Sequence, residues 1–304
     1  MLSTKGDLLV ASCISIQIAI EYLKCSGRDY SMTSGPNVTE VNKFVGAIKQ
    51  REKVLDGCRR FHEIEPRDIA YVVCSKLVSQ VPGDISHILA GVRIFLQVWN
   101  AVYIQHLPQN VKQSMEEDIR HAYLSCSVEL NLLAKDRLDN IELTQGEKAV
   151  AVTKAYTAFA QYTSIADTGA TKVLHLLNPA LFMMWDTKIR EAYHTLLPDQ
   201  LWMEFIQKFN EEQRKQLEKL PPFMRKQLIE KTPQFMSEWY LLFMGICQQI
   251  AQALVKDTSE SELWSRHITF IKDNDFIRSW GFSETLAKMI DECNFVRWAR
   301  GTDF

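Results

Sequence analysis

Apolar side chains recur three and four residues apart along most of this 304-residue chain. The segment from Ile85 to Tyr103 shows the pattern clearly, with apolar residues at Ile88, Leu89, Val92, Phe95, Leu96, Trp99 and Val102. This spacing places the side chains on one face of an α-helix, which can then pack against other helices. Strict alternation of apolar and polar residues, which would indicate strands, is absent, as is a repeat of fixed period. The sequence therefore predicts an all-α protein.

Turn-forming residues divide the chain into a series of predicted helices. Proline, glycine, asparagine and serine interrupt the apolar pattern and mark the loops. The predicted helices span residues 1–25, 39–55, 66–77, 85–103, 111–135, 147–166, 171–177, 187–193, 200–209, 238–255, 263–271 and 286–298, and the charged segment 210–219 is expected to be a solvated helix. Asn37 or Thr39 is expected to cap the second of them. A chain of this length can bury a large core, and its apolar termini and centre predict one compact body.

The cysteine and charge content narrows the class of protein. The seven cysteines are odd in number and widely spaced, without a C-x-x-C pair, which predicts reduced core thiols in a cytoplasmic protein. No apolar run is long enough to span a bilayer, so no membrane partner is expected. The net charge of −2 argues against a uniformly basic surface. The segment from Lys148 to Arg190, however, contains five basic residues and only two acidic ones, which allows a local basic surface.

The stretch Asp167–Tyr193 carries an order of residues that points beyond a general helical protein. Three small residues predict a turn and are followed by a short apolar segment, Thr171–Leu177, that predicts a buried helix. The pair Asn178-Pro179 ends this helix, because proline lacks an N–H donor and disfavours helix in the residue before it. The small residues are Thr168, Gly169 and Ala170.

The second half of this stretch predicts a buried run followed by a capped helix. The continuous apolar run Leu181–Trp185 is expected to be buried on all sides. Asp186 comes directly before the helical segment Thr187–Tyr193. It is therefore predicted as the N-cap, whose carboxylate accepts hydrogen bonds from the free N–H groups of the first helical turn.

These residues resemble the centre of the helix-hairpin-helix DNA glycosylases. In that family a glycine-containing hairpin leads into a helix, and bifunctional members carry a lysine near the start of that helix. An aspartate heads the next helix, within a pattern like V-D-T-H-V-x-R. The matching positions here are Gly169, Lys172 and the segment Trp185-Asp186-Thr187-Lys188-Ile189-Arg190. The segment VLHLLNPALFMMWD and the C-terminal IDECNFVRWAR are also similar to uncharacterised bacterial and archaeal proteins.

The resemblance implies a two-lobed helical fold, a DNA partner and specific residue roles. One lobe would comprise residues 1–135 with 236–304 and the other residues 136–235, and double-stranded DNA would bind at the cleft between them. Lys172 would attack the sugar of a flipped nucleotide, and Asp186 would activate water or stabilise positive charge on the sugar. The backbone would be bound by Thr168, Gly169, Ala170, Lys188 and Arg190, and the base pocket would include Phe182 and Trp185.

Each of these residues also has a purely structural interpretation. A lysine at a helix start can extend to solvent or bind phosphate, and Asp186 can act as a helix cap alone. The aromatic rings of Phe182 and Trp185 suit a core equally well. His175 lies within an apolar run, which favours a hydrogen-bonded buried histidine over a ligand.

Local motifs for metals and cofactors are not found in the sequence. The seven histidines show no H-x-x-x-H or H-E-x-x-H spacing, and no cysteine cluster for an iron–sulfur centre occurs. Nucleotide-binding glycine loops and a G-x-S-x-G motif are absent too. The sequence thus predicts no metal and no cofactor.

Three functions remain open at this level. The first is a DNA-repair protein related to base-excision glycosylases, which cleaves the N-glycosidic bond of a flipped base through Lys172 and Asp186. The second is a catalytically silent helical scaffold that binds DNA or a protein. The third is a helical interaction protein unrelated to DNA. The first two differ in whether Lys172 and Asp186 face one cleft within a few ångströms of a nucleotide-sized space, and the third predicts no basic rim around that cleft. The composition gives no indication of the oligomeric state.

Overall fold

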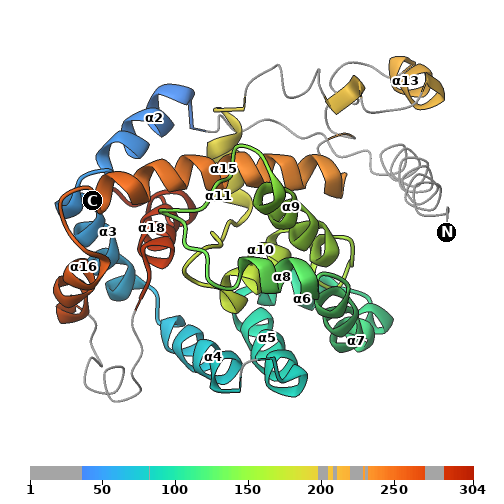
Figure 1. Cartoon of the computed structure of the whole chain (residues 1–304), viewed down its shortest axis with the longest axis horizontal. Coiled ribbons are helices and arrows are strands. Elements are labelled where there is room, and N and C mark those ends of the chain that lie inside the picture. The colour runs from blue at the N-terminus through green and yellow to red at the C-terminus, as the bar shows by residue number, and fades with distance from the viewer. Residues whose placement is uncertain are drawn as a thin grey trace. The chain divides into compact units, whose positions relative to one another are not determined.

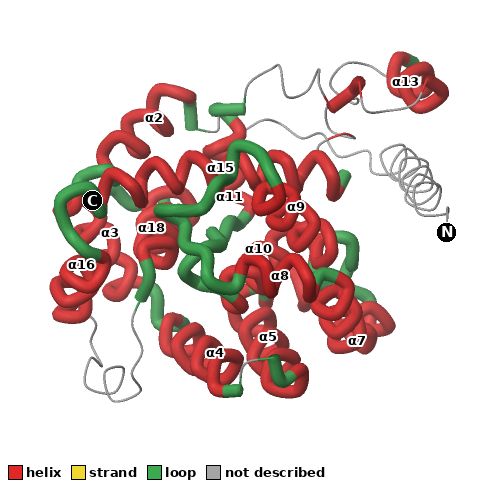
Figure 2. Tube along the Cα trace, in the orientation of Figure 1, coloured by secondary structure: helices red, strands yellow, loops and turns green. Residues whose placement is uncertain are grey.

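The computed structural model describes residues 36–81, 83–197, 205–207, 211–219, 229, 232–270 and 284–304. Among these residues every regular element is helical and no strand occurs, as Figures 1 and 2 show. The predicted all-α class is confirmed. The helix expected over residues 1–25 and most of the one expected over residues 200–209 lie outside the described residues.

The helices are short to medium in length. The α-helices are α2 (Val38–Ala47), α3 (Arg51–Ile64), α4 (Asp68–Gln80), α5 (Ile85–Trp99), α6 (Ala101–His106), α7 (Gln109–Ser125), α8 (Ser127–Leu133), α9 (Glu147–Ala160), α10 (Ala166–Leu177), α11 (Thr187–His194), α13 (Glu211–Glu218), α15 (Pro233–Leu254), α16 (Glu260–His267) and α18 (Leu286–Asn294). A 3₁₀ turn, η1 (Ile268–Phe270), follows α16, and a π-helical turn, η2 (Phe295–Ala299), follows α18.

Two units can be distinguished along the chain. The larger one comprises residues 36–195 and 237–304. The described residues of 196–236, including α13, belong to the smaller one. All residues of the candidate site lie in the larger unit.

Polar side chains fix the beginnings of several helices in this unit. Asn37 accepts a hydrogen bond from the Glu40 amide, and the Glu40 carboxylate accepts one from the Asn37 amide, so α2 begins with a capping box. Asp186 caps α11 by accepting from the Ile189 amide at 2.9 Å. Both caps were predicted from the sequence and are confirmed.

The central apolar run forms part of the core. Leu181, Phe182, Met183 and Trp185 are fully buried, as predicted. The Trp185 ring lies 5.2 Å from the rings of both Trp239 and Tyr240 on α15, and the Tyr240 hydroxyl donates to the Met183 carbonyl at 2.7 Å. The run is thus held against α15 by ring packing and by a buried hydrogen bond.

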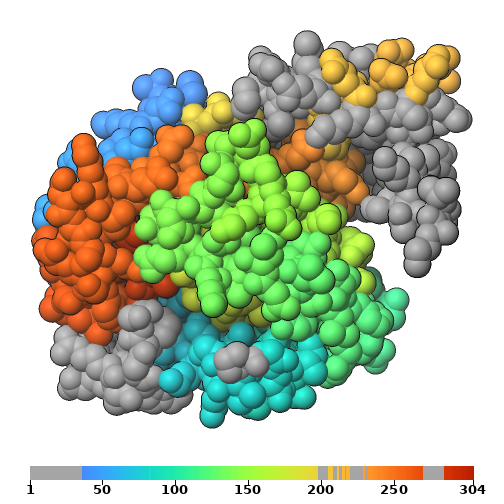
Figure 3. All heavy atoms as spheres, viewed as in Figure 1, coloured from blue at the N-terminus to red at the C-terminus, as the bar shows by residue number. Residues whose placement is uncertain are grey.

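The loop between α8 and α9 crosses α15 and is fastened to it. Gln248 on α15 donates to the Leu138 carbonyl at 3.0 Å, and Gln252 donates to the Asp139 carbonyl at 3.2 Å. This loop passes in front of α15 in Figure 1, and its atoms lie on the surface there in Figure 3. Side-chain amides therefore satisfy backbone groups of a long connection that has no regular structure.

Five of the seven cysteines lie among the described residues. Cys58, Cys74, Cys126, Cys247 and Cys293 are free and buried. None of the described helices combines the length and the apolarity needed to cross a bilayer.

Helices α4 and α5 approach closely at Gly91, where a Cβ atom would lie 2.6 Å from Val78 Cγ2 and 3.2 Å from the Cys74 carbonyl oxygen. We expect Gly91→Ala to lower the free energy of unfolding by about 1–2 kcal/mol, because overpacking outweighs the gain in helix propensity. Gly245→Ala on α15, where a Cβ would meet nothing within 4 Å, should raise it by about 0.5–1 kcal/mol. Urea unfolding measures both, and a Gly91→Ala protein as stable as the wild type would contradict this packing.

Candidate functional site

A pocket of about 180 Å³ lies where the end of α5, the middle of α10, the start of α11 and α18 meet. Lys172 and Asp186 both line it, together with Arg67 and Trp99. The two residues predicted to carry chemistry come from different helices, and the fold places them around one space. Whether Lys172 and Asp186 face one space is the feature that distinguishes a glycosylase-like protein from a catalytically silent scaffold.

The amine of Lys172 is held inside the protein. Its Nζ donates to the Trp99 carbonyl at 2.7 Å and to Asn100 Oδ1 at 3.3 Å, and the residue is only 7% exposed. Burial lowers the pKa of Lys172 to about 8, although the negative charge of Asp186 acts in the opposite direction. The positive charge of Arg67 lowers the pKa further. The interpretation of Lys172 as a lysine that extends to solvent is therefore wrong.

The acceptor for this amine exists because α5 ends early. The sequence pattern predicted one helix over residues 85–103, but α5 stops at Trp99 and α6 begins at Ala101. Asn100 between them has φ −125° and ψ 21°. The end of a helix leaves carbonyl groups without intrahelical partners, and the Trp99 carbonyl is the one that Lys172 binds.

The Asp186 side chain has two roles in the structure. One of its carboxylate oxygens caps α11 through the Ile189 amide, and the side chain also lines the pocket. A cap fixes the direction of the carboxylate, so the structural and chemical interpretations of Asp186 are compatible.

Arg67 and three aromatic rings form another part of the wall. Arg67 makes two hydrogen bonds of 2.6 Å to the Glu65 carboxylate, and its guanidinium lies 4.8 Å from the centre of the Trp99 ring. The rings of Phe61 and Trp99 are stacked at 6.4 Å, and Phe295 meets both edge-on. A bidentate ion pair and a cation–π contact thus hold a planar cation beside an apolar surface.

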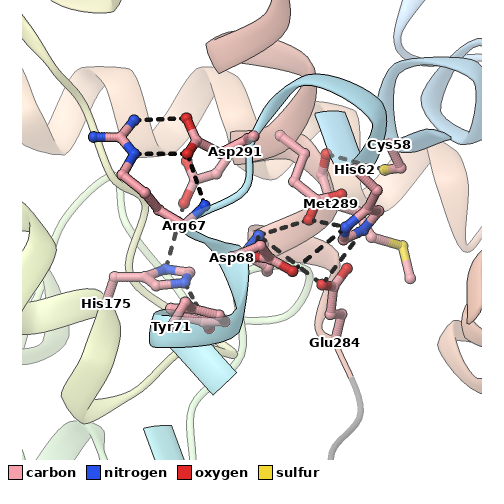
Figure 4. A network of polar contacts seen from close by, with 12 residues as sticks. Cys58, His62, Arg67, Asp68, Tyr71, His175, Glu284, Met289 and Asp291 are labelled. Atoms are coloured by element: carbon pink, nitrogen blue, oxygen red, sulfur yellow. Dashed lines mark hydrogen bonds and ion pairs between the residues drawn. The ribbon is translucent and has the colours of Figure 1, made fainter. Parts of the chain in front are cut away.

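Helix α18 supplies the acidic wall. Both carboxylate oxygens of Asp291 accept from the Met184 amide, at 3.0 and 2.9 Å, and burial raises the pKa of Asp291 well above its ordinary value. His175, Tyr71 and Asp291 lie close together in Figure 4. His175 is fully buried, with Nε2 2.9 Å from the Tyr71 hydroxyl and Nδ1 2.6 Å from the Phe182 carbonyl. Its prediction as a hydrogen-bonded core histidine is confirmed.

The structure distributes the other predicted residues over three environments. Trp185 lines the pocket, whereas Phe182 is a core residue whose carbonyl binds His175. Lys188 is exposed and pairs with Glu191 at 3.0 Å. Arg190 is partly buried and forms an ion pair with Asp167.

The predicted turn at Thr168, Gly169 and Ala170 is wrong, because α10 already begins at Ala166. Gly169 and Ala170 are buried within this helix. A Cβ on Gly169 would lie 3.1 Å from Ile165 Cγ2 and 3.4 Å from Asn100 Nδ2. The distance to Asn100 is an ordinary van der Waals contact, so the tight approach at Gly169 is to Ile165, just before α10, and Gly169 packs beside the end of α5.

A second group of polar residues next to the pocket was not found from the sequence. His62, His267, Glu284 and Glu292 present ligand-type atoms that all lie within 4.8 Å of one another. Their separations along the chain match no local metal-binding spacing, so a motif search does not detect them. The only sequence sign was the C-terminal segment IDECNFVRWAR, which contains Glu292.

The polar groups around Glu292 compensate one another's charge. Lys288 Nζ lies 2.6 Å from Glu292 and 3.2 Å from Asp68. Burial lowers the pKa of Lys288, but the carboxylates of Asp68, Glu292 and Glu284 outweigh it and raise that pKa overall. Burial and the charge of Glu284 raise the pKa of Glu292 well above its ordinary value.

No protein-family model, curated protein or solved structure matches the chain. The interpretation of the site therefore depends on its own geometry.

The Lys172 amine holds its proton less tightly in the folded chain, with a pKa of about 8, than in the unfolded chain, where the ordinary value is 10.5. Between these pH values the unfolded state carries more protons, so the folded state gains stability as the pH rises. We expect the unfolding free energy of the wild type, relative to Lys172→Met, to increase by up to about 3 kcal/mol over this range. Urea unfolding of both proteins measures it, and a difference that does not change with pH would contradict the buried amine.

Proposed function

We propose that this chain is a helix-hairpin-helix DNA glycosylase-like protein that cleaves the N-glycosidic bond of a base held in the Lys172 pocket. Lys172 is the amine nucleophile, and Asp186 stabilises positive charge on the sugar. One observation carries the proposal: a buried amine with a pKa near 8 and a fixed carboxylate line the same small pocket. A silent scaffold would gain nothing from burying this amine, which costs stability.

The chemistry requires a neutral amine at the pH of the cell. With a pKa of about 8, about a tenth of the Lys172 amine is unprotonated at pH 7, far more than for an ordinary lysine. The amine nitrogen forms a bond to C1′ of the sugar while the bond from C1′ to the base breaks, and the base leaves with the bonding electrons. Opening of the sugar ring then gives a Schiff base, which borohydride reduces to a stable amine.

The pocket walls suit a flat, polar-edged ring. Stacked and edge-on aromatic rings form one side, and Arg67 adds a planar cation. Trp99 and Trp185, which line the pocket, each have a buried indole N–H without a hydrogen-bond partner among the described residues. The pocket, of about 180 Å³, is lined by groups from several helices, which a base still stacked in a duplex does not reach. We therefore expect the base to enter after flipping out of the duplex.

The connection between α9 and α10 supplies the hairpin of the proposed fold. These helices pack against each other and are joined by residues 161–165. Ala166 at the start of α10 has φ +57°, which is costly for a residue with a side chain. Two hydrogen bonds hold this connection in place. Tyr103 donates to the Thr163 carbonyl, and Ser164 donates to Asp118. We place the DNA backbone at this connection, with the exposed Lys188 as an additional contact, because Gly169 and Ala170 lie inside α10.

Borohydride trapping tests the chemistry. The wild type is incubated with duplexes that carry an abasic site or 8-oxoguanine, and covalent adducts are resolved by electrophoresis. We expect an adduct that Lys172→Ala abolishes and that Asp186→Asn reduces by about 10²-fold or more, because asparagine keeps the cap but lacks the charge. Lys154→Ala, at an exposed lysine on α9 that pairs with Glu129, is the matched control and should retain the adduct.

Two outcomes would count against the proposal. An adduct that persists in Lys172→Ala would place the reactive amine elsewhere. A wild-type protein that forms no adduct and shows no salt-sensitive binding to the duplexes would exclude both the catalytic role and the DNA partner.

A further inference from the structure

The group of His62, His267, Glu284 and Glu292 is assembled from three separate parts of the chain. His62 lies near the end of α3, and His267 is the last residue of α16. Glu284 precedes α18 and Glu292 lies on it. His62 and Glu284 point toward each other beside Asp68 in Figure 4. All four side chains are at most 4% exposed, so this is not a solvated acidic surface.

The distances within the group, measured to either oxygen of each glutamate, lie on both sides of the edge length of a coordination tetrahedron. Zinc–ligand bonds of about 2.0–2.1 Å in a tetrahedron place neighbouring ligand atoms roughly 3.4 Å apart. Here His62 Nε2 lies 3.2 Å from His267 Nε2 and 3.5 Å from Glu292 Oε1, and His267 Nε2 lies 3.6 Å from Glu292 Oε2. Glu284 lies 2.5 Å from His267 Nε2 and 3.9 Å from His62 Nε2. One ligand-type atom from each of the four side chains lies within 4.8 Å of the other three, so binding of one ion would draw the most widely separated atoms closer together.

The ligand atoms are oriented and available. Both histidines direct Nε2 toward the group, while Nδ1 of His62 lies 3.4 Å from Asp68 Oδ2. A carboxylate on the opposite ring nitrogen is the usual arrangement behind a metal-bound histidine. Glu284 Oε1 and Glu292 Oε2 are buried and have no hydrogen-bond partner among the described residues. Buried carboxylate oxygens of this kind are costly unless a ligand satisfies them.

The net negative charge of the group also favours binding of a divalent cation. The carboxylates of Asp68, Glu284 and Glu292 face one ammonium, that of Lys288. With neutral imidazoles this leaves two negative charges in a buried region. One divalent cation balances these two charges.

We infer that His62, His267, Glu284 and Glu292 bind one divalent transition-metal ion, and that zinc suits their tetrahedral nitrogen and oxygen donors best. Four protein ligands fill the tetrahedron, so the site is closed and structural and has no position for a substrate. It ties α3, α16 and α18 together. Because Glu292 also lines the Lys172 pocket, the ion fixes the acidic wall of that pocket.

Metal analysis of the purified full-length chain tests this inference. Protein from zinc-supplemented cultures is measured by mass spectrometry of the metal, then stripped with a chelator and titrated with Zn²⁺ against a chromophoric competitor. We expect about one ion per chain, and at least tenfold weaker binding in His62→Gln and Glu292→Gln. Asp68→Asn, which removes the carboxylate behind His62, should weaken binding about 10–100-fold. His121→Gln, at an exposed histidine on α7, is the control and should bind as the wild type does.

A wild-type chain that binds no zinc, or ligand variants that bind it unchanged, would overturn the inference. If the ligand variants fail to fold, Co²⁺ is added to the metal-free wild type and its visible absorption spectrum tests the inference. Strong visible bands of a tetrahedral ion support the site, and the weak bands of an octahedral ion overturn it. Neither result affects the trapping experiment, which reports on Lys172 alone.

Discussion

The hydrogen bond from the Lys172 amine to the Trp99 carbonyl is the interaction on which the pocket depends. It requires α5 to end at Trp99 and α10 to pass close by. The hydrogen bonds from the ammonium group to two neutral oxygens offset only part of the free energy that its burial costs. The same burial that costs stability gives the amine a pKa near 8, which nucleophilic chemistry needs. This opposition between stability and reactivity is typical of functional sites.

Helix α18 connects the pocket with the buried polar group beside it. Asp291 holds the Met184 amide and so fixes the run that leads to Asp186. One turn of the same helix carries Lys288 and Glu292, which line the pocket and also form an ion pair with each other within the buried charged network. A metal ion bound by Glu292 would therefore stiffen a wall of the pocket without taking part in the chemistry at Lys172. Stability and site geometry would then respond together to loss of the ion.

The sequence predicted the features that depend on neighbouring residues. Helical periodicity gave the all-α class, and the position of Asp186 before an apolar helix gave its role as a cap. The turn at Thr168–Ala170 was wrong because small residues suit a close helix crossing as well as a turn. Asn100, a polar residue in an apolar stripe, marked the end of α5 but was not recognised. The acceptor for Lys172 lies 73 residues away, and His62 and His267 are 205 residues apart. Such pairings are set by packing, which local patterns in one sequence do not contain.

The most direct measurement is the pKa of the Lys172 amine itself. Reductive methylation with ¹³C-formaldehyde labels the lysines, and ¹³C NMR follows each dimethylamine as the pH changes, with Lys172→Met identifying the resonance. One resonance that titrates at about pH 8 and is missing in Lys172→Met is the expected result. If the Lys172 resonance titrates with the surface lysines near their ordinary value of about 10.4, the amine is not buried as described, and the proposed nucleophile loses its physical basis.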